Sequence, residues 1–173
     1  MEQEKNTNGN KKAALYVAQG AIIAALYVAL TLIFAPISFG AMQVRIAEAL
    51  TIMPLFTPVA IPGLFVGCII ANIMGGAIVW DVVFGSLATL IGAALGYVLR
   101  KNRWLVPIPA VVSNSVIVPL VLKYGYGMDM PLYLIVIYVA LGEIVGCYLL
   151  GELLATALLK RGFIGIIRGD GEK

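Results

Sequence analysis

The sequence predicts an all-α integral membrane protein with six transmembrane helices, and its composition is the first observation behind that prediction. Hydrophobic residues make up 61% of the 173 residues and charged residues only 12%, whereas charged residues are about a quarter of a typical soluble protein. The mean hydropathy of +0.99 points the same way. A chain of this length has room for about six spans of roughly 20 residues, with almost nothing left for a soluble domain.

The positions of the basic residues are the second observation, because they predict how the chain lies in the membrane. With an even number of spans, all lysines and arginines except Arg45 and Lys123 fall on the same side as both termini. Basic residues collect in cytoplasmic loops, so we expect both termini in the cytoplasm. The net charge of +3 comes from these loops and does not predict binding to nucleic acid.

Three regions follow from the distribution of apolar residues. Residues 1–12 are polar and are expected to be a disordered tail, residues 13–161 form the six-helix membrane domain, and residues 162–173 form a cytoplasmic tail. The first apolar run is too long for the core of a cleavable signal and ends at Pro36. The predicted helices are residues 13–35, 44–56, 58–72, 82–99, 104–122 and 132–159.

The second and third helices are predicted to be short and joined by a buried bend. Pro54, Pro58 and Pro62 recur at every fourth residue, and each removes an amide donor and kinks or breaks a helix. At 1.5 Å per residue the second helix reaches only about 20 Å, short of the ~30 Å hydrocarbon core.

Ionisable residues inside apolar runs are the candidate site residues. A charge within a bilayer costs about 2.5–3.5 kcal/mol on insertion scales, so such residues usually face a cavity or the bundle interior. Arg45 and Glu48 are three residues apart and would share a helical face, where Arg45 can orient Glu48. Glu143 lies near mid-membrane, and we favour a functional role over that of a protonated structural acid.

Other singled-out residues have a structural interpretation beside the functional one. Asn114 can hold helices together and Asn72 can cap its helix, while Trp80 and Asp81 fit an interfacial aromatic and an N-terminal helix acid. The alanines at every third or fourth position of the first helix allow another helix to approach closely. That helix can belong to the same chain or to another subunit. These residues, which we call the alanine stripe, are Ala14, Ala18, Ala21, Ala25 and Ala29.

Several function classes are excluded by what the sequence lacks. There is no histidine, and Cys68 and Cys147 lie in apolar runs, where they fit small core residues better than a metal site or a disulfide. No glycine-rich phosphate loop is present, so the chain does not hydrolyse ATP by that route. We therefore predict no catalytic residues, no metal, no cofactor and no enzymatic activity.

Two stretches carry a resemblance to a known family. FGAMQVRIAEALTIMPLFTPVAIPGLFVGCIIAN, at residues 39–72, and WDVVFGSLATLIGAALG, at residues 80–96, resemble the QueT family. Its members are substrate-binding S components of energy-coupling factor transporters for queuosine precursors. The resemblance implies a multi-pass protein of a prokaryotic plasma membrane that works with a transmembrane coupling subunit and two ABC ATPase subunits.

The resemblance also implies roles for particular residues. Ala21 and Ala25 would touch the coupling subunit, Tyr138 and Glu143 would form a binding pair on the sixth helix, and residues 37–43 would be a lid. Phe39 and Gln43 would be its ligand contacts.

For a 7-deazaguanine ligand, Glu143 can accept the ring N–H groups and Asn114 can serve the neighbouring carbonyl. Asp81 or Glu48 can bind a cationic substituent, and Trp80 or Tyr138 can stack on the ring. The alternatives are an S component for another vitamin or nucleobase-like micronutrient, and a membrane scaffold without a ligand.

Overall fold

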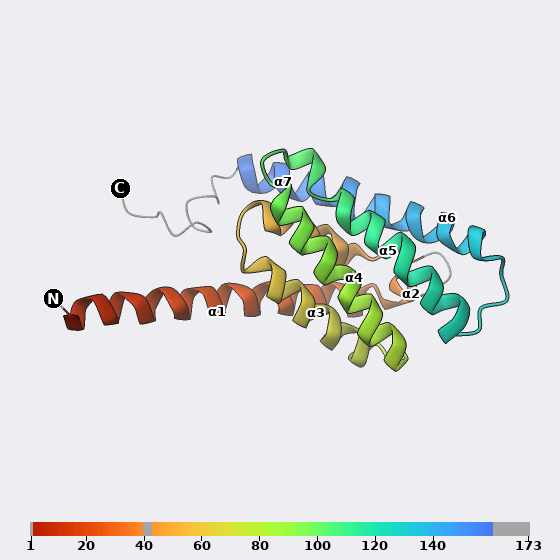
Figure 1. The fold of residues 1–173 in the computed structure, drawn as a ribbon, viewed down its shortest axis with the longest axis horizontal. Coiled ribbons are helices and arrows are strands. Elements are labelled where there is room, and N and C mark those ends of the chain that lie inside the picture. Colours follow the sequence, from red (N-terminus) through yellow and green to blue (C-terminus); the bar gives the residue numbers. More distant parts are fainter. Residues whose placement is uncertain (1, 40–42, 161–173) are drawn as a thin grey trace.

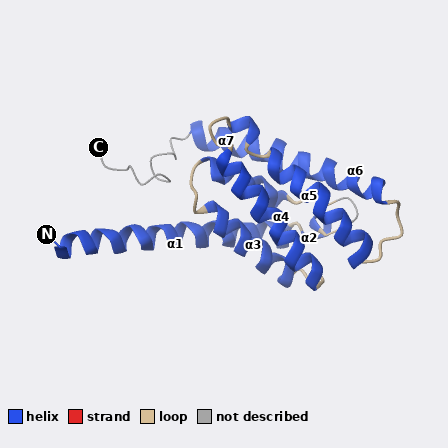
Figure 2. Cartoon of the chain, in the orientation of Figure 1, coloured by secondary structure: helices blue, strands red, loops and turns tan. Residues whose placement is uncertain are grey.

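The structure is a computed structural model that describes residues 2–39 and 43–160. All regular elements in this part of the chain are helices (Figure 2), which confirms the predicted all-α class. The expected tail 162–173 and residues 40–42 of the expected lid lie outside the described residues. The α-helices are α1 (Glu2–Ile33), α2 (Ala35–Ser38), α3 (Ala60–Met74), α4 (Val79–Val98), α5 (Ile108–Leu120), α6 (Leu132–Glu143) and α7 (Gly151–Lys160).

Shorter helical turns of other types connect the α-helices. Two are 3₁₀-helices, η1 (Ile46–Leu55) and η2 (Arg103–Leu105), and two are π-helical turns, η3 (Val121–Gly125) and η4 (Ile144–Leu150). α6, η4 and α7 follow one another without a break and form one long helical stretch. Only Val106 and Pro107 separate η2 from α5, which continues directly into η3, so these elements form a second one.

Four of the described helical stretches are long and apolar enough to cross a membrane. They are Gly9–Ile33, Val79–Val98, Arg103–Gly125 and Leu132–Lys160. The other two predicted spans correspond to the shorter apolar helices Ile46–Leu55 and Ala60–Met74. These reach only about 20 Å each, at roughly 2.0 Å per residue in a 3₁₀-helix and 1.5 Å in an α-helix. The six-span topology therefore remains a prediction.

Two elements differ from the sequence-based expectation. α1 begins at Glu2, so the polar segment that we expected to be disordered continues the first helix. Adding residues to an existing helix requires no new nucleus, although this segment contains Asn, Thr and Gly, which favour a helix less than its Glu, Gln and Lys. The second predicted helix is a 3₁₀-helix in which most residues are buried. A 3₁₀-helix is tighter than an α-helix and suits this crowded position.

The bundle is arranged around η1, which contacts α1, α3, α4, α7 and η4. α1 packs on α3, α3 on α4, α4 on α5 and α5 on α6. Figure 1 shows α1 along one side of the bundle, with its N-terminal half extending beyond the other helices. The largest apolar core cluster lies where α1, η1 and α3 meet and includes Ile23, Leu50 and Leu64.

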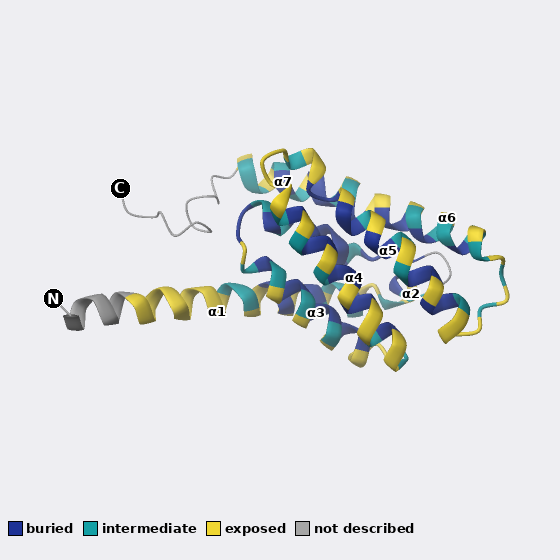
Figure 3. Ribbon diagram, in the orientation of Figure 1, coloured by how far each residue is buried: buried dark blue, intermediate teal, exposed yellow. Residues whose placement is uncertain are grey.

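The outward faces of the helices are apolar, which is the opposite of a soluble protein. Figure 3 shows exposed residues along the outer sides of the helices, and many of them are large hydrophobic residues. Examples are Val79, which is 75% exposed, Leu153 at 67% and Val116 at 59%. Soluble monomers rarely expose contiguous apolar patches of more than a few hundred Å². Such faces are stable where they contact lipid.

Candidate functional site

Polar side chains gather inside the bundle near η1. The structure buries most of the residues that the sequence singled out, namely Gln43, Arg45, Glu48, Asn72, Asp81, Asn114 and Glu143. They belong to α3, α4, α5, α6, η1 and the segment that enters η1, so only the folded chain can bring them near one another. Burying a polar group without a hydrogen bond costs about 2–7 kcal/mol, so the partners of these groups decide what the cluster can do.

Glu143 is the last residue of α6 and is only 4% exposed. Asn114 Nδ2, from α5, donates a hydrogen bond to Glu143 Oε2 at 3.1 Å. Cys147 Sγ, one turn further along the chain, donates to the same oxygen at 3.0 Å. The structure thus brings together Asn114 and Glu143, the two residues predicted to read a guanine-like edge. Glu143 also directly precedes the π-helical turn η4, a type of irregularity that is frequent at functional sites.

Glu48 has side-chain partners that the sequence did not suggest. The Tyr27 hydroxyl of α1 donates a hydrogen bond to Glu48 Oε1. Cys147 Sγ lies 3.9 Å from Glu48 Oε2, so the thiol is placed between two carboxylates. The sequence analysis gave Tyr27 no role and treated Cys147 as a small core residue. The spacing of Glu143 and Cys147, four residues apart on one helical face, was the available signal for the thiol.

Glu48, Glu143 and Cys147 are the best candidates for metal ligands among the described residues. Glu48, Glu143 and Cys147 each place a ligand atom within 4.8 Å of the others, and all three are buried. Carboxylates and a thiolate are groups that can hold a metal ion. Here Tyr27, Asn114 and the Cys147 thiol already supply donors to the two carboxylates, so hydrogen bonds account for the arrangement.

Arg45 interacts with Asp81 as well as with the backbone of Glu48, and its role in orienting the Glu48 carboxylate remains a prediction. Arg45 Nη2 lies 3.9 Å from Asp81 Oδ2, and Arg45 Nε donates to the Ser38 carbonyl oxygen at 3.4 Å. The Phe39 ring lies under the guanidinium, 5.4 Å from its central carbon. Arg45 precedes η1 with extended backbone angles, φ −85° and ψ 105°. It caps this helix, because Glu48 N donates a hydrogen bond to the Arg45 carbonyl oxygen at 3.0 Å.

Asp81 is held by residues from two other parts of the chain. Asn72 Nδ2 donates to the Asp81 carbonyl oxygen at 3.3 Å, and the Tyr126 hydroxyl donates to Asp81 Oδ2 at 3.2 Å. Burial and the neighbouring Asp81 carboxylate raise the pKa of the Tyr126 hydroxyl. Tyr126 therefore remains a hydrogen-bond donor at neutral pH.

Three buried polar atoms of this group make no hydrogen bond within the described part of the chain. They are Arg45 Nη2, Asn72 Oδ1 and Asp81 Oδ1. Their residues are 4%, 0% and 1% exposed. Leaving a buried donor or acceptor unsatisfied costs about 1–3 kcal/mol, and such atoms in a native protein call for water or a ligand. Together they offer one donor and two acceptors.

Glycines on the last long helical stretch let the segment before η1 pass beside Glu143. A Cβ atom on Gly142 would collide with the carbonyl oxygen of Gln43, and one on Gly146 would lie 2.7 Å from the carbonyl oxygen of Arg45. The two glycines thus admit an extended backbone segment, which positions Gln43 and Arg45 at the cluster.

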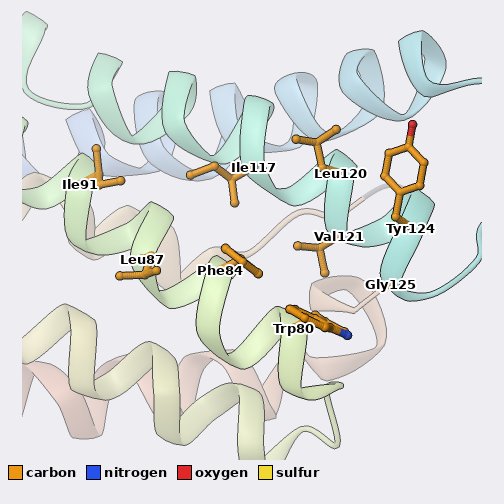
Figure 4. Close-up of a pocket in the computed structure, with 9 residues that line it drawn as sticks. All are labelled: Trp80, Phe84, Leu87, Ile91, Ile117, Leu120, Val121, Tyr124 and Gly125. Carbon is orange, nitrogen blue, oxygen red and sulfur yellow. The ribbon is translucent and has the colours of Figure 1, made fainter.

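Two aromatic residues proposed for stacking lie away from the polar cluster. Trp80 is 60% exposed and stacks on Phe84, with ring centroids 5.8 Å apart. It lines an apolar groove of about 740 Å³ between α4 and the end of α5 (Figure 4). Tyr138 is half-buried on α6, and five residues of helix separate its direction from that of Glu143 by about 140°.

Ala21 and Ala25 lie on the exposed side of α1. Ala24 and Tyr27 of the same helix are buried against α3, where a Cβ atom on Gly67 would lie 3.0 Å from the Ala24 Cα atom. Within the described part of the chain, the alanine stripe is therefore not what packs α1 onto its neighbour.

An apolar surface around buried charged side chains defines a multi-pass membrane protein that can accommodate a polar group within the membrane. The sequence model of the QueT transporter family matches residues 17–160, and the chain belongs to this family. This confirms the resemblance seen in the sequence and makes the chain a transport protein rather than an enzyme.

One curated relative is the queuosine precursor transporter QueT of Lactococcus lactis subsp. cremoris. It is 38% identical to this chain over 93 residues, which cover 51% of this chain and 54% of the relative. The chain thus spans about half the length of the curated relative that it matches. No solved structure matches the chain.

Proposed function

We propose that this chain is the substrate-binding (S) subunit of an ATP-driven importer of the energy-coupling factor type, and that it captures a queuosine precursor from outside the cell. The substrate would be a 7-deazaguanine such as preQ0, preQ1 or queuine. The single observation that carries the proposal is the buried cluster in which Arg45, Asn72 and Asp81 keep polar atoms that make no hydrogen bond within the described part of the chain. The printed name of the relative supports the class of substrate.

Glu143 is the proposed recognition carboxylate. A 7-deazaguanine has adjacent N–H donors on its pairing edge, and an ionised carboxylate can accept both. Glu143 Oε2 already accepts from Asn114 and Cys147, which leaves Oε1 and the remaining capacity of the carboxylate for the ligand. Asn114 can turn its amide toward the ring carbonyl once the ligand replaces it at Glu143.

The Arg45–Asp81 group is proposed to bind the other polar groups of the ligand. Together with Asn72, this group has one donor and two acceptors that make no described hydrogen bond, and they complement a ring that carries one carbonyl and further N–H groups. Asp81 or Glu48 would receive a cationic substituent, and Phe39 and Gln43 would close the site from the lid. For stacking, Tyr138 and Trp80 have less support than Phe39, whose ring already lies under Arg45.

Delivery to the cytoplasm requires partners, because the sequence has no phosphate-binding loop. We propose a transmembrane coupling subunit and two ABC ATPase subunits, with Ala21 and Ala25 as the docking surface for the coupling subunit. The exposure of both alanines supports this role. The charge distribution supports cytoplasmic termini and a site that opens to the outside.

Two other functions remain in competition. An S component for a different vitamin or nucleobase-like micronutrient would use the same buried cluster with another ligand. In a scaffold without a ligand, water molecules or protonation of the carboxylates would satisfy the buried polar groups.

Mass spectrometry of small molecules that co-purify with the chain, combined with thermal unfolding in added 7-deazaguanines, separates these possibilities. A ligand at 100 times its Kd stabilises the folded state by about 2.7 kcal/mol. We expect a 7-deazaguanine to raise the melting temperature, whereas guanine and unrelated vitamins should not. Stabilisation by another micronutrient alone would reassign the substrate. The absence of any ligand effect would favour the scaffold.

A further inference from the structure

Tyr27 lies between the packing of α1 on α3 and the candidate site. Its side chain is fully buried, and its hydroxyl donates to Glu48 Oε1. A Cβ atom on Gly67 would lie 3.0 Å from Tyr27 Cβ. The missing side chain at Gly67 therefore lets α1 approach α3 closely enough for the hydroxyl to be held at Glu48.

Glu48 depends on this hydroxyl for a strong hydrogen bond. The ion pair of Arg45 goes to Asp81. The Cys147 thiol has one proton, and its sulfur is 3.0 Å from Glu143 but 3.9 Å from Glu48. Of the residues that the structure describes, Tyr27 is thus the one oxygen or nitrogen donor to the Glu48 carboxylate.

We propose that Tyr27 is a positioning residue of the site, whose hydroxyl fixes Glu48 Oε1 and leaves Oε2 to accept a hydrogen bond from the ligand. This inference rests on the proposed function, since it concerns the affinity for the same ligand. Hydrogen bonds between a hydroxyl and a carboxylate are about twice as strong as those between neutral groups. The hydroxyl also keeps the carboxylate in one rotamer, so less ordering is required when the ligand binds.

The test is a titration calorimetry measurement of 7-aminomethyl-7-deazaguanine binding to the purified full chain. Tyr27→Phe should weaken binding about tenfold, as expected for the loss of a hydrogen bond to a charged group. Thr31→Val is the matched control. Thr31 is a fully buried residue of α1 whose hydroxyl donates to the Tyr27 carbonyl oxygen at 2.9 Å and makes no described contact with Glu48. It should change the affinity less than twofold.

A second background separates positioning from general packing. In Glu48→Gln the acceptor is neutral, so Tyr27→Phe should there weaken binding only about threefold. The same tenfold loss in both backgrounds would mean that Tyr27 does not act through Glu48. If Tyr27→Phe does not fold, Gly67→Ala replaces it, because this change keeps the hydroxyl but pushes the ring away from α3.

The outcomes also separate this inference from the proposed function. If the wild-type chain and Thr31→Val bind no 7-deazaguanine, the proposed function fails and the inference fails with it. If both bind and Tyr27→Phe binds within twofold of them, the positioning role is refuted while the proposed function stands.

Discussion

Replacing Glu143 by glutamine changes the central carboxylate of the site with little change in shape. Glutamine exchanges one acceptor oxygen for an NH2 donor. In the native chain Glu143 Oε2 accepts from Asn114 Nδ2 at 3.1 Å and from Cys147 Sγ at 3.0 Å. The glutamine oxygen will accept these two hydrogen bonds. If the side chain were flipped, its NH2 group would face two other donors, Asn114 Nδ2 and the Cys147 thiol. In the favoured orientation the NH2 group faces the ligand.

The size of the effect follows from this orientation. An NH2 group that opposes a ring N–H leaves both donors unsatisfied in a site from which water is excluded. Each unmatched buried polar group costs about 1–3 kcal/mol, and more where a charge-assisted bond is lost. We therefore expect the affinity for a 7-deazaguanine to fall by about tenfold to several hundredfold. The stability of the ligand-free protein should hardly change, since both native hydrogen bonds persist.

Titration calorimetry of the purified variant measures this loss, and thermal unfolding without ligand checks the fold. Glu152→Gln is the matched control, because Glu152 is a second buried glutamate whose ion pair is with Arg103 at 3.1 Å, outside the site. It should bind within twofold of the wild type. Wild-type affinity in Glu143→Gln would refute the recognition role, and Asp81 and Glu48 would become the candidate carboxylates.

Three further changes test the docking surface, the lid and the glycine contacts. Ala25→Trp should leave ligand binding by the isolated chain intact and abolish uptake in cells, because the ring keeps another helix from approaching; lost binding by the isolated chain would point to internal packing. Deletion of residues 39–42 should mainly raise the dissociation rate in stopped-flow measurements, since a lid retains a ligand more than it recognises it, and an unchanged residence time would remove this loop from the site. Gly146→Ala should lower the stability by about 1–3 kcal/mol in thermal unfolding, because its methyl carbon would lie 2.7 Å from the Arg45 carbonyl oxygen. Unchanged stability would show that the segment before η1 moves freely.

Local features of the sequence were sufficient to predict the class and most of the helices. Hydropathy, the basic clusters and the prolines are properties of neighbouring residues, so the helices after Pro58 begin and end within a few residues of their predicted bounds. The ionisable residues in apolar runs also identified most of the buried cluster, because a charge at membrane depth is costly wherever it lies. Glu143 and Glu48 were found in this way.

Partners and directions of side chains required the tertiary structure. A soluble helix reveals its inward face by alternating with polar residues, but a helix in lipid is apolar on both sides. The sequence therefore did not tell that Tyr27 points to Glu48 while Trp80 points outward, or that the Cys147 thiol lies between two carboxylates. The contact of Arg45 with Asp81 depends on the extended backbone before η1, a feature set by the glycines of a helix about a hundred residues away.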